Sequence, residues 1–555
     1  MKKSHILLIF SIITTIAQVA EAQTLTEEVV IDREITPVVR ASVRPSWVTP
    51  TLLTPRMEKK RLSFYEFTGT SDITRSISTL EPTPWADSLM RSPYRGYASL
   101  GYFPVFNLGG AAGYRFIHNN KADVGARVSY DGSSWSGGDG TEGKFKQNQL
   151  SVGVDGTVNF GAGHLSSGVD YTYSATDGPE KGSYLRGTQA INLFDFKAEW
   201  IASHAERFNW KTGAYFGYGG FTKAKTIGNR DYEPVKDITF GANADVSYNF
   251  SEISGVALGI DADFRHIYGE TLYSLYDDAK DSRLLGIIGL RPAYRFVSGK
   301  ISGRVGLRLD INTGEPGNKM HLAPDVEVRW APLQQIAVYG RATGGEVMNS
   351  NRDLWERNPW MTGVFAAERS HVNADVEIGM TFGSYKGAWA TVHAGWSSVS
   401  NWAVPVSISN TSVWDMAKIE GFDFGLELGY SWKKWFTVKG NFSGATHGKY
   451  YKWQDNAKWV FDIAAKIRPV EKLQIEVGYD ARLSRRGFVF DTVTADYRQV
   501  SLGHTSNLFV GAEYEVTPAF GVFLKAENLL NRHWNVVPDV RSTGVHGLLG
   551  VQYKF

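Results

Sequence analysis

The sequence predicts an all-β protein: a transmembrane antiparallel β-barrel of about 22 strands, with a Pro-rich extended N-terminal arm and no full plug domain. Three observations predict it. From residue 95 to residue 555, apolar and polar side chains alternate in segments of about 9–15 residues. The links between these segments are alternately short and long, and the chain begins with a secretion signal. We therefore expect strands with one face towards lipid and the other towards water.

The segment 239–250 shows the alternation. Phe240 and Val246 lie at even positions, whereas Asn243 and Asp245 lie at odd positions. A soluble β-sandwich alternates in the same way, so one strand does not distinguish the two classes. The number of segments, the asymmetry of the links and the secretion signal favour the barrel.

Composition excludes several other classes of protein. The mean hydropathy is −0.24, and beyond the N-terminus no apolar run approaches the length of a membrane helix. Aromatic residues make up 13% of the chain, which suits the girdles of a barrel at the two membrane interfaces. A formal net charge of +2 argues against nucleic acid as a partner. Without cysteine there is no disulfide, thiolate metal site or lipidated N-terminal cysteine.

The N-terminus reads as a signal peptide. Lys2 and Lys3 precede an apolar stretch, and Ala20-Glu21-Ala22 forms a small-x-small cleavage site. We therefore divide the chain into a signal peptide (1–22), an arm in the periplasm or the lumen (23–94) and the barrel (95–555). The arm holds 7 of the 19 prolines, which disfavour central strands.

The links predict how the barrel is oriented. Short links include 119–121 and 384–386; long links include 343–370, 398–414 and 484–498. Because outer-membrane barrels have short periplasmic turns and long extracellular loops, we place both termini in the periplasm of a bacterium with an outer membrane. A lumen of this width must be filled by the arm, by long loops folded inward or by another protein.

Two stretches resemble the barrel of TonB-dependent receptors. Residues 523–532 (FLKAENLLNR) resemble that family's penultimate strand, and 550–555 (GVQYKF) follow as the final strand. Residues 357–359 (RNP), followed by ERS at 368–370 and VEIG at 376–379, resemble a second family pattern. The resemblance implies a receptor-like barrel for solute uptake across the outer membrane.

The resemblance does not extend to the front of the chain. The family carries a plug of well over a hundred residues, whereas 23–94 comprises 72 residues. The chain therefore looks like a plug-deficient, Bacteroidetes-type branch of these barrels. Glu28, Val29, Val30 and Ile31 loosely resemble a TonB box, which would add as a strand to a TonB-type energiser.

Aromatic residues in the long links are the candidate ligand-binding residues. Trp355 and Trp360 lie in the longest link and suit either ligand contact or closure of the lumen. Tyr451 and Trp453 flank Lys452 at the base of another link, where they suit either sugar stacking or a membrane-interface girdle.

The sequence gives no support for a catalytic or metal centre. The 12 histidines show no metal-ligand spacing, and no Ser, His and Asp spacing singles out a triad. Residues 138–144 resemble a phosphate-binding loop, but Phe145 replaces the required Ser or Thr. We therefore predict no enzyme activity, no metal and no cofactor.

Two functions remain open. The first is solute uptake, with outer-membrane lipids around the barrel and a TonB-type energiser or a surface or periplasmic lipoprotein as partner. The alternative is a non-transporting barrel subunit of an envelope assembly or secretion complex. The missing plug favours the alternative, whereas the long aromatic-bearing loops favour uptake. The sequence does not identify a substrate.

Overall fold

The structure is a computed structural model that describes residues 94–555 with short gaps. The gaps are 104–106, 137–143, 179–184, 187–188, 203–206, 224–225, 228–232, 271–280, 315–316, 364–366, 409–410, 434, 448–456, 492–493, 495 and 539.

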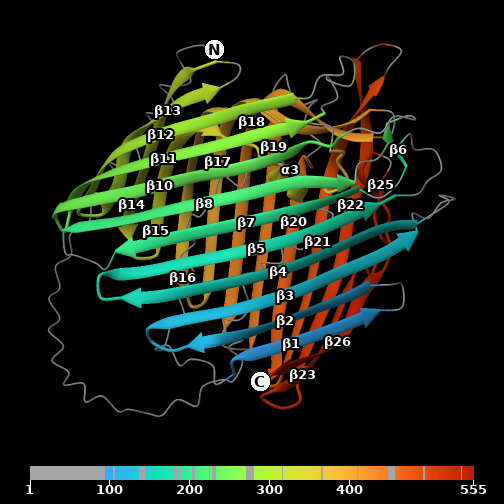
Figure 1. Cartoon of the computed structure of the whole chain (residues 1–555). Coiled ribbons are helices and arrows are strands. Elements are labelled where there is room, and N and C mark those ends of the chain that lie inside the picture. Colours follow the sequence, from blue (N-terminus) through green and yellow to red (C-terminus); the bar gives the residue numbers. More distant parts are fainter. Residues whose placement is uncertain are drawn as a thin grey trace, which may run out of the picture. The chain divides into compact units, whose positions relative to one another are not determined.

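Twenty-two strands form a single sheet in which each strand pairs antiparallel with the next along the chain (Figure 1). They are β1 (Gly96–Phe103), β2 (Asn107–His118), β3 (Ala122–Ser136), β4 (Lys144–Phe160), β5 (Gly163–Asp177), β7 (Gln189–Ala202), β8 (Phe208–Lys223), β10 (Lys236–Ser251), β11 (Ser254–Gly269), β12 (Asp281–Ser298), β13 (Ile301–Gly314), β14 (Lys319–Leu333), β15 (Ile336–Val347), β16 (Ser370–Tyr385), β17 (Ala388–Ile408), β18 (Thr411–Trp432), β19 (Phe436–His447), β20 (Trp459–Val470), β21 (Leu473–Asp491), β22 (Asp496–Glu515), β23 (Phe520–Glu527) and β26 (His546–Lys554).

The sheet closes on itself, because the last strand pairs with the first. Tyr97 lies opposite Lys554, and Tyr102 lies opposite Leu549. The main-chain N–H of Gly96 also donates to the carbonyl of Phe555 at 2.7 Å. A closed barrel leaves no bare strand edge, which is a requirement in lipid. The predicted fold class, a transmembrane barrel of about 22 strands, is confirmed.

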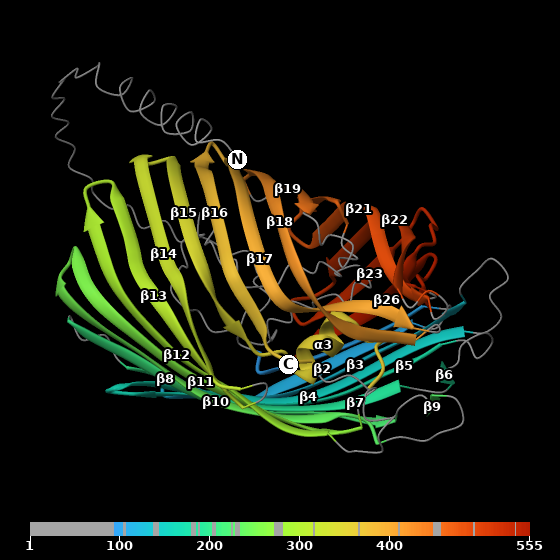
Figure 2. The same ribbon diagram turned by 90° about the horizontal axis from the view of Figure 1, so that it is seen from above.

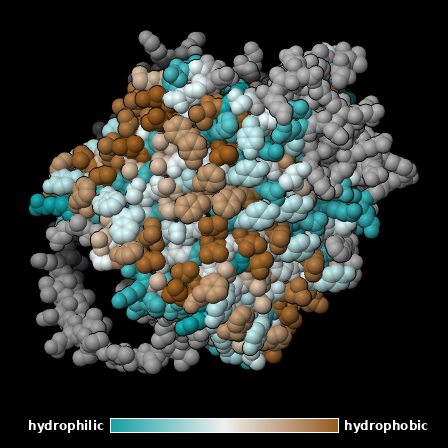
Figure 3. Space-filling view, viewed as in Figure 1, coloured by the Kyte–Doolittle hydropathy of each residue, from teal (hydrophilic) through white to brown (hydrophobic). Residues whose placement is uncertain are grey.

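The two faces of the wall differ as the alternation predicts. Large apolar side chains point outward and are exposed, among them Leu307 (50%), Leu322 (68%) and Ile378 (60%). Figure 3 shows apolar side chains spread across the strand wall on one face of the molecule. An exposed apolar surface of this extent is typical of a wall that faces hydrocarbon.

One end of the barrel is made of tight turns. In the turn between β16 and β17, both Lys386 (φ 52°) and Gly387 (φ 91°) have positive φ. Positive φ at both central residues defines the two-residue hairpin turn whose twist matches the twist of the strands it joins. We call this the short-turn end and the opposite one the long-link end.

Some strands extend past the barrel at the long-link end. β17 and β18 have 21 and 22 residues, whereas about 9–11 suffice to cross a bilayer. The β17–β18 register shifts between Val399 and Trp402, where Asn401 has a φ of 52°. The predicted long link 398–414 is therefore wrong: nearly all of it is strand. The predicted link 484–498 is wrong for the same reason, because β21 and β22 occupy most of it.

The remaining elements lie in the links. They are the helix α3 (Asn351–Arg357) and the two-stranded sheets β6 (Leu185–Arg186) with β9 (Thr226–Ile227) and β24 (Asn535–Val537) with β25 (Val540–Arg541). No helix in the described part of the chain has the length and apolar character needed to cross a membrane.

Candidate functional site

The link between β15 and β16 folds into the ring of strands and carries α3 (Figure 2). We call residues 348–369 the inward loop. Its helix begins with a capping box: the Ser350 hydroxyl accepts from the N–H of Asp353, and the Asp353 carboxylate accepts from the N–H of Ser350, both at 3.1 Å. A helix of seven residues is unstable in isolation, so contacts with the barrel must hold it.

A buried ionic network fixes the start of α3 to the wall. Arg265 on β11 is fully buried; it donates to Asp237 on β10 at 2.7 Å and to the side-chain oxygen of Asn351 at 3.1 Å. It also donates to the carbonyl of Ala367, near the end of the inward loop, at 2.7 Å. Asp237 in turn accepts from the N–H of Asn351 at 2.7 Å. We call Arg265, Asp237 and Asn351 the latch.

Apolar packing continues from the latch across the opening of the lumen at the long-link end, which we call the mouth. Leu354, Trp355 and Met361 of the inward loop are buried in one cluster. The wall contributes residues from two separated sectors: Ile191, Leu193 and Phe221 on β7 and β8, and Ala403 and Trp414 on β17 and β18. The loop therefore bridges wall sectors that are several strands apart in the ring.

The end of α3 is held by a cation between two rings. The guanidinium carbon of Arg357 lies 4.6 Å from the ring centroid of Trp402 and 4.6 Å from that of Trp414. The same guanidinium donates to the carbonyl of Ala403 at 2.5 Å. Arg357 thus attaches the loop to the bent extension of β17 and β18.

Trp360 reaches a third sector. It packs with Trp135 and Phe145 on β3 and β4 and with Val537 on β24. β24 belongs to the last long link, where Asn528 is fully buried with a φ of 50° and donates to the carbonyl of Thr543 at 2.9 Å. Asn528 is part of the stretch that resembles the receptor family, and its place in this turn gives that residue a structural role.

The end of the inward loop is anchored by Arg369. It is 7% exposed and donates to the carbonyls of Gly286 and Thr313 at 3.0 and 2.6 Å. Burial lowers the pKa of the Arg369 guanidinium, while Glu346 and Glu368 oppose that shift. The side chain remains charged at neutral pH because arginine titrates far above it.

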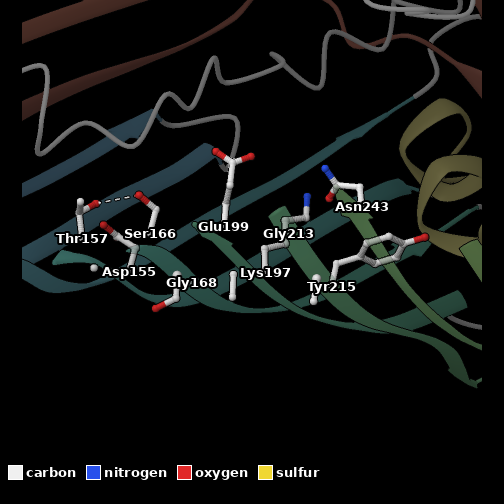
Figure 4. A pocket seen from close by; sticks show the side chains of 13 residues that line it. Asp155, Thr157, Ser166, Gly168, Lys197, Glu199, Gly213, Tyr215 and Asn243 are labelled. Carbon is white, nitrogen blue, oxygen red and sulfur yellow. Dashed lines mark hydrogen bonds between the residues drawn. The ribbon is translucent and has the colours of Figure 1, made fainter. Parts of the chain in front are cut away.

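Below the mouth, the lumen wall holds a polar pocket of about 440 Å³ formed by β4, β5, β7, β8 and β10. Its lining includes Asp155, Lys197, Glu199 and Asn243. Figure 4 shows the side chains of this pocket, including Thr157 and Ser166, whose hydroxyl oxygens are 3.2 Å apart. The pocket offers hydrogen-bond donors, hydrogen-bond acceptors and side chains of both charges.

Ion pairs cross the lumen wall in many places. Arg127 donates to Asp155 at 2.7 Å and to Asp170, and Arg304 donates to Asp325 at 2.5 Å. These side chains are partly exposed to the lumen, with 25% of Arg127 accessible. These charged side chains therefore pair with one another along the lumen face of the wall.

The structure places two of the predicted ligand-binding residues inside the mouth. Trp355 and Trp360 are only 4% and 6% exposed, so both rings are covered by protein. Ligand binding by either ring stays a prediction. Tyr451, Trp453 and the segment Glu28–Ile31 lie outside the described residues.

Sequence reasoning missed the latch and a second group, His321, Glu346 and His371, whose ligating atoms lie within 4.8 Å of one another. Strand pairing brings the two histidines and Glu346 together, whereas the latch joins the paired strands β10 and β11 to the helix α3. Neighbours in the latch are separated by 28 and 86 residues along the chain, so no short motif could reveal them. For Glu346 and His371, the register of β15 and β16 is the signal that could have revealed the pair.

Similar folds occur among solved outer-membrane receptors. The FrpB iron transporter from Neisseria meningitidis superposes with a TM-score of 0.64 at 12% identity, covering 84% of this chain and 82% of that one. The siderophore receptor PirA from Acinetobacter baumannii gives a TM-score of 0.64 at 9% identity over 83% and 80% of the two chains. The ferripyoverdine receptor of Pseudomonas aeruginosa gives 0.62 at 11% identity over 83% and 72%. The fold is that of these receptors. No protein-family model and no curated protein sequence matches the chain.

Proposed function

We propose that this protein is a receptor-like barrel of the bacterial outer membrane that admits a solute, with the inward loop controlling entry. One observation carries the proposal: a wide polar lumen whose mouth is bridged by a loop that the wall holds largely through side-chain contacts. When these side-chain contacts break, the loop detaches from the wall while the strand pairs of the barrel stay intact. The short-turn end and both termini then face the periplasm.

An iron chelate is the first solute class to test. The similar structures are those of an iron transporter and of siderophore receptors, which supports this choice. The mixed charges of the lumen pocket, which include Lys197 and Glu199, suit a polar solute.

We further propose that the chain is a plug-deficient, Bacteroidetes-type barrel. Residues 23–94 are too few for the plug of the receptor family, so the arm or a partner completes the closure. The partner is a TonB-type energiser that pairs with the segment 28–31, or a surface or periplasmic lipoprotein.

A second candidate is a non-transporting subunit of an envelope assembly or secretion complex. It is favoured by the absence, among residues 94–555 as described, of any globular domain besides the barrel. Such a barrel would serve as a membrane anchor for partners.

Conductance in planar bilayers separates these possibilities. The full mature chain is compared with a variant that lacks 23–94. Large channels only in the variant identify the arm as the plug, and channels in both forms identify a partner as the lid. Cells with and without the gene are then compared for uptake of radiolabelled ferric siderophores. The uptake proposal is overturned in favour of assembly if the barrel is closed, the cells with the gene take up no more ferric siderophore than those without it, and the protein copurifies with other envelope proteins.

A further inference from the structure

Three potential metal ligands meet on the lumen face at the long-link end. His321 lies on β14, Glu346 at the end of β15 and His371 at the start of β16, directly opposite Glu346. The Nε2 atom of His321 is 3.3 Å from Oε1 of Glu346, and the Nδ1 atom of His371 is 2.8 Å from the same oxygen. The two imidazole rings have centroids 4.2 Å apart.

The geometry differs from that of an ordinary ion pair. The Nδ1 atom of His371 is buried and interacts with the Glu346 carboxylate 2.8 Å away, although the angle between them is poor for a hydrogen bond. One protonated imidazole would balance that carboxylate, whereas two protonated rings this close would repel each other. Ligands about 2.0–2.1 Å from a shared tetrahedral ion lie about 3.3 Å apart. The distance from His321 to Glu346 matches this value, the distance from His371 to Glu346 is 0.5 Å shorter, and all three ligating atoms lie within 4.8 Å of one another.

The backbone around Glu346 is built to aim its side chain. A β-bulge shifts the register between Thr343 and Gly345, and Gly345 has a φ of 122°. A side chain there would collide with Asp310, because its Cβ would lie 2.5 Å from Oδ2. The N–H of Glu346 donates to that same Oδ2 at 2.6 Å, and Arg308 donates to the Glu346 carbonyl at 3.1 Å. Bulges commonly re-aim one side chain towards a site.

A further oxygen is nearby. Asn312 hydrogen-bonds to Glu346. Its Oδ1 is buried and has no hydrogen-bond partner among the described residues. Asn312 is 5% exposed. It therefore supports the position of the carboxylate and leaves an oxygen available.

We propose that His321, Glu346 and His371 bind a divalent first-row transition-metal ion of the Zn²⁺ type. Two imidazoles and one carboxylate select such ions over Mg²⁺ and Ca²⁺, which prefer oxygen ligands. A bound ion would join β14, β15 and β16 at the two ends of the inward loop. This site is independent of the uptake proposal, because it requires only the folded barrel.

Metal binding to the full mature chain in detergent tests the proposal. The chain is stripped with a chelator and titrated with Zn²⁺ by calorimetry; we expect about one ion per chain. His371→Ala and Glu346→Gln each weaken binding by at least about a hundredfold, since loss of an outer partner alone typically costs about 10–100-fold. Cobalt(II) absorption of the wild type provides a second readout of imidazole ligation.

The matched control is His118→Ala, since His118 pairs with Asp123 at 2.9 Å elsewhere on the wall. It should bind Zn²⁺ like the wild type, and Mg²⁺ should not compete. A difference in electrophoretic mobility between heated and unheated samples confirms that each variant is a folded barrel. The proposal is overturned if the wild type binds no Zn²⁺ or if folded His371→Ala binds it as tightly as the wild type.

Discussion

The mouth and the middle of the lumen use the same pair of residue types in opposite ways. At the mouth, Arg265 is fully buried and holds Asp237 and two parts of the inward loop. In the middle of the wall, Arg127 is 25% exposed and pairs with Asp155 and Asp170, whose side chains are 34% and 42% exposed. A buried charge without its partner is costly, whereas solvated pairs contribute little. The mouth therefore specifies one loop position, and the wall tolerates change.

The largest effect is expected at the latch. Arg265→Ala leaves Asp237 buried and unpaired and should lower the free energy of unfolding by about 3–5 kcal/mol. It should also expose the inward loop to protease and raise conductance. Urea unfolding in lipid vesicles and limited proteolysis measure both effects. If the variant and the wild type were equally stable and their loops equally protected from protease, the latch would not hold the inward loop.

Trp355→Ala tests the apolar half of the mouth. The side chain is 4% exposed in a cluster with Phe221 and Leu354, so its loss leaves a cavity and should cost about 3 kcal/mol. The rate of amide hydrogen exchange in the inward loop should rise in the same variant. Unchanged exchange would show that α3 does not depend on this contact.

The two faces of one strand sharpen the contrast. Val152 on β4 points outward and is 42% exposed, whereas its neighbour Ser151 faces the lumen and contacts Thr172. Val152→Arg should destabilise the barrel in vesicles by about 2–3 kcal/mol, since a charge would enter hydrocarbon. Ser151→Arg is the matched control and should cost much less. If Ser151→Arg destabilised the barrel more than Val152→Arg, the lipid-facing and lumen-facing sides of β4 would be assigned the wrong way round.

The smallest effect is expected in the middle of the wall. Arg127→Ala removes partly exposed pairs and should change the free energy of unfolding by no more than about 1 kcal/mol, with the inward loop still protected. Urea unfolding of Arg127→Ala and Arg265→Ala under the same conditions compares the two losses of unfolding free energy directly. A loss as large as that of Arg265→Ala would erase the difference between the two regions.

The sequence predicts the barrel because the alternation of faces is local and is repeated along the chain. It does not predict the length of β17, because the serine-rich stretch from Ser397 to Asn401 resembles a turn although the pairing with β18 resumes at Trp402.

The site was less accessible to sequence reasoning. Trp355 and Trp360 were identified, but their burial depends on wall residues far away in the sequence. His321, Glu346 and His371 lie 25 residues apart (346 − 321 and 371 − 346), a separation that becomes a contact only when three strands pair in register.

The inward position of the loop is the central claim, and a disulfide tests it most directly. A Cβ built on Gly363 would lie 3.0 Å from the Cβ of Phe221 on β8. The shortest usual Cβ–Cβ separation in a disulfide is about 3.5 Å, so a small outward shift of the loop brings two cysteines at these positions into range. The chain has no cysteine, so Phe221→Cys with Gly363→Cys introduces a single possible bond. We predict that it forms on mild oxidation in intact outer membranes and holds the conductance low until it is reduced. A pair that stays reduced in a correctly folded barrel would contradict the account.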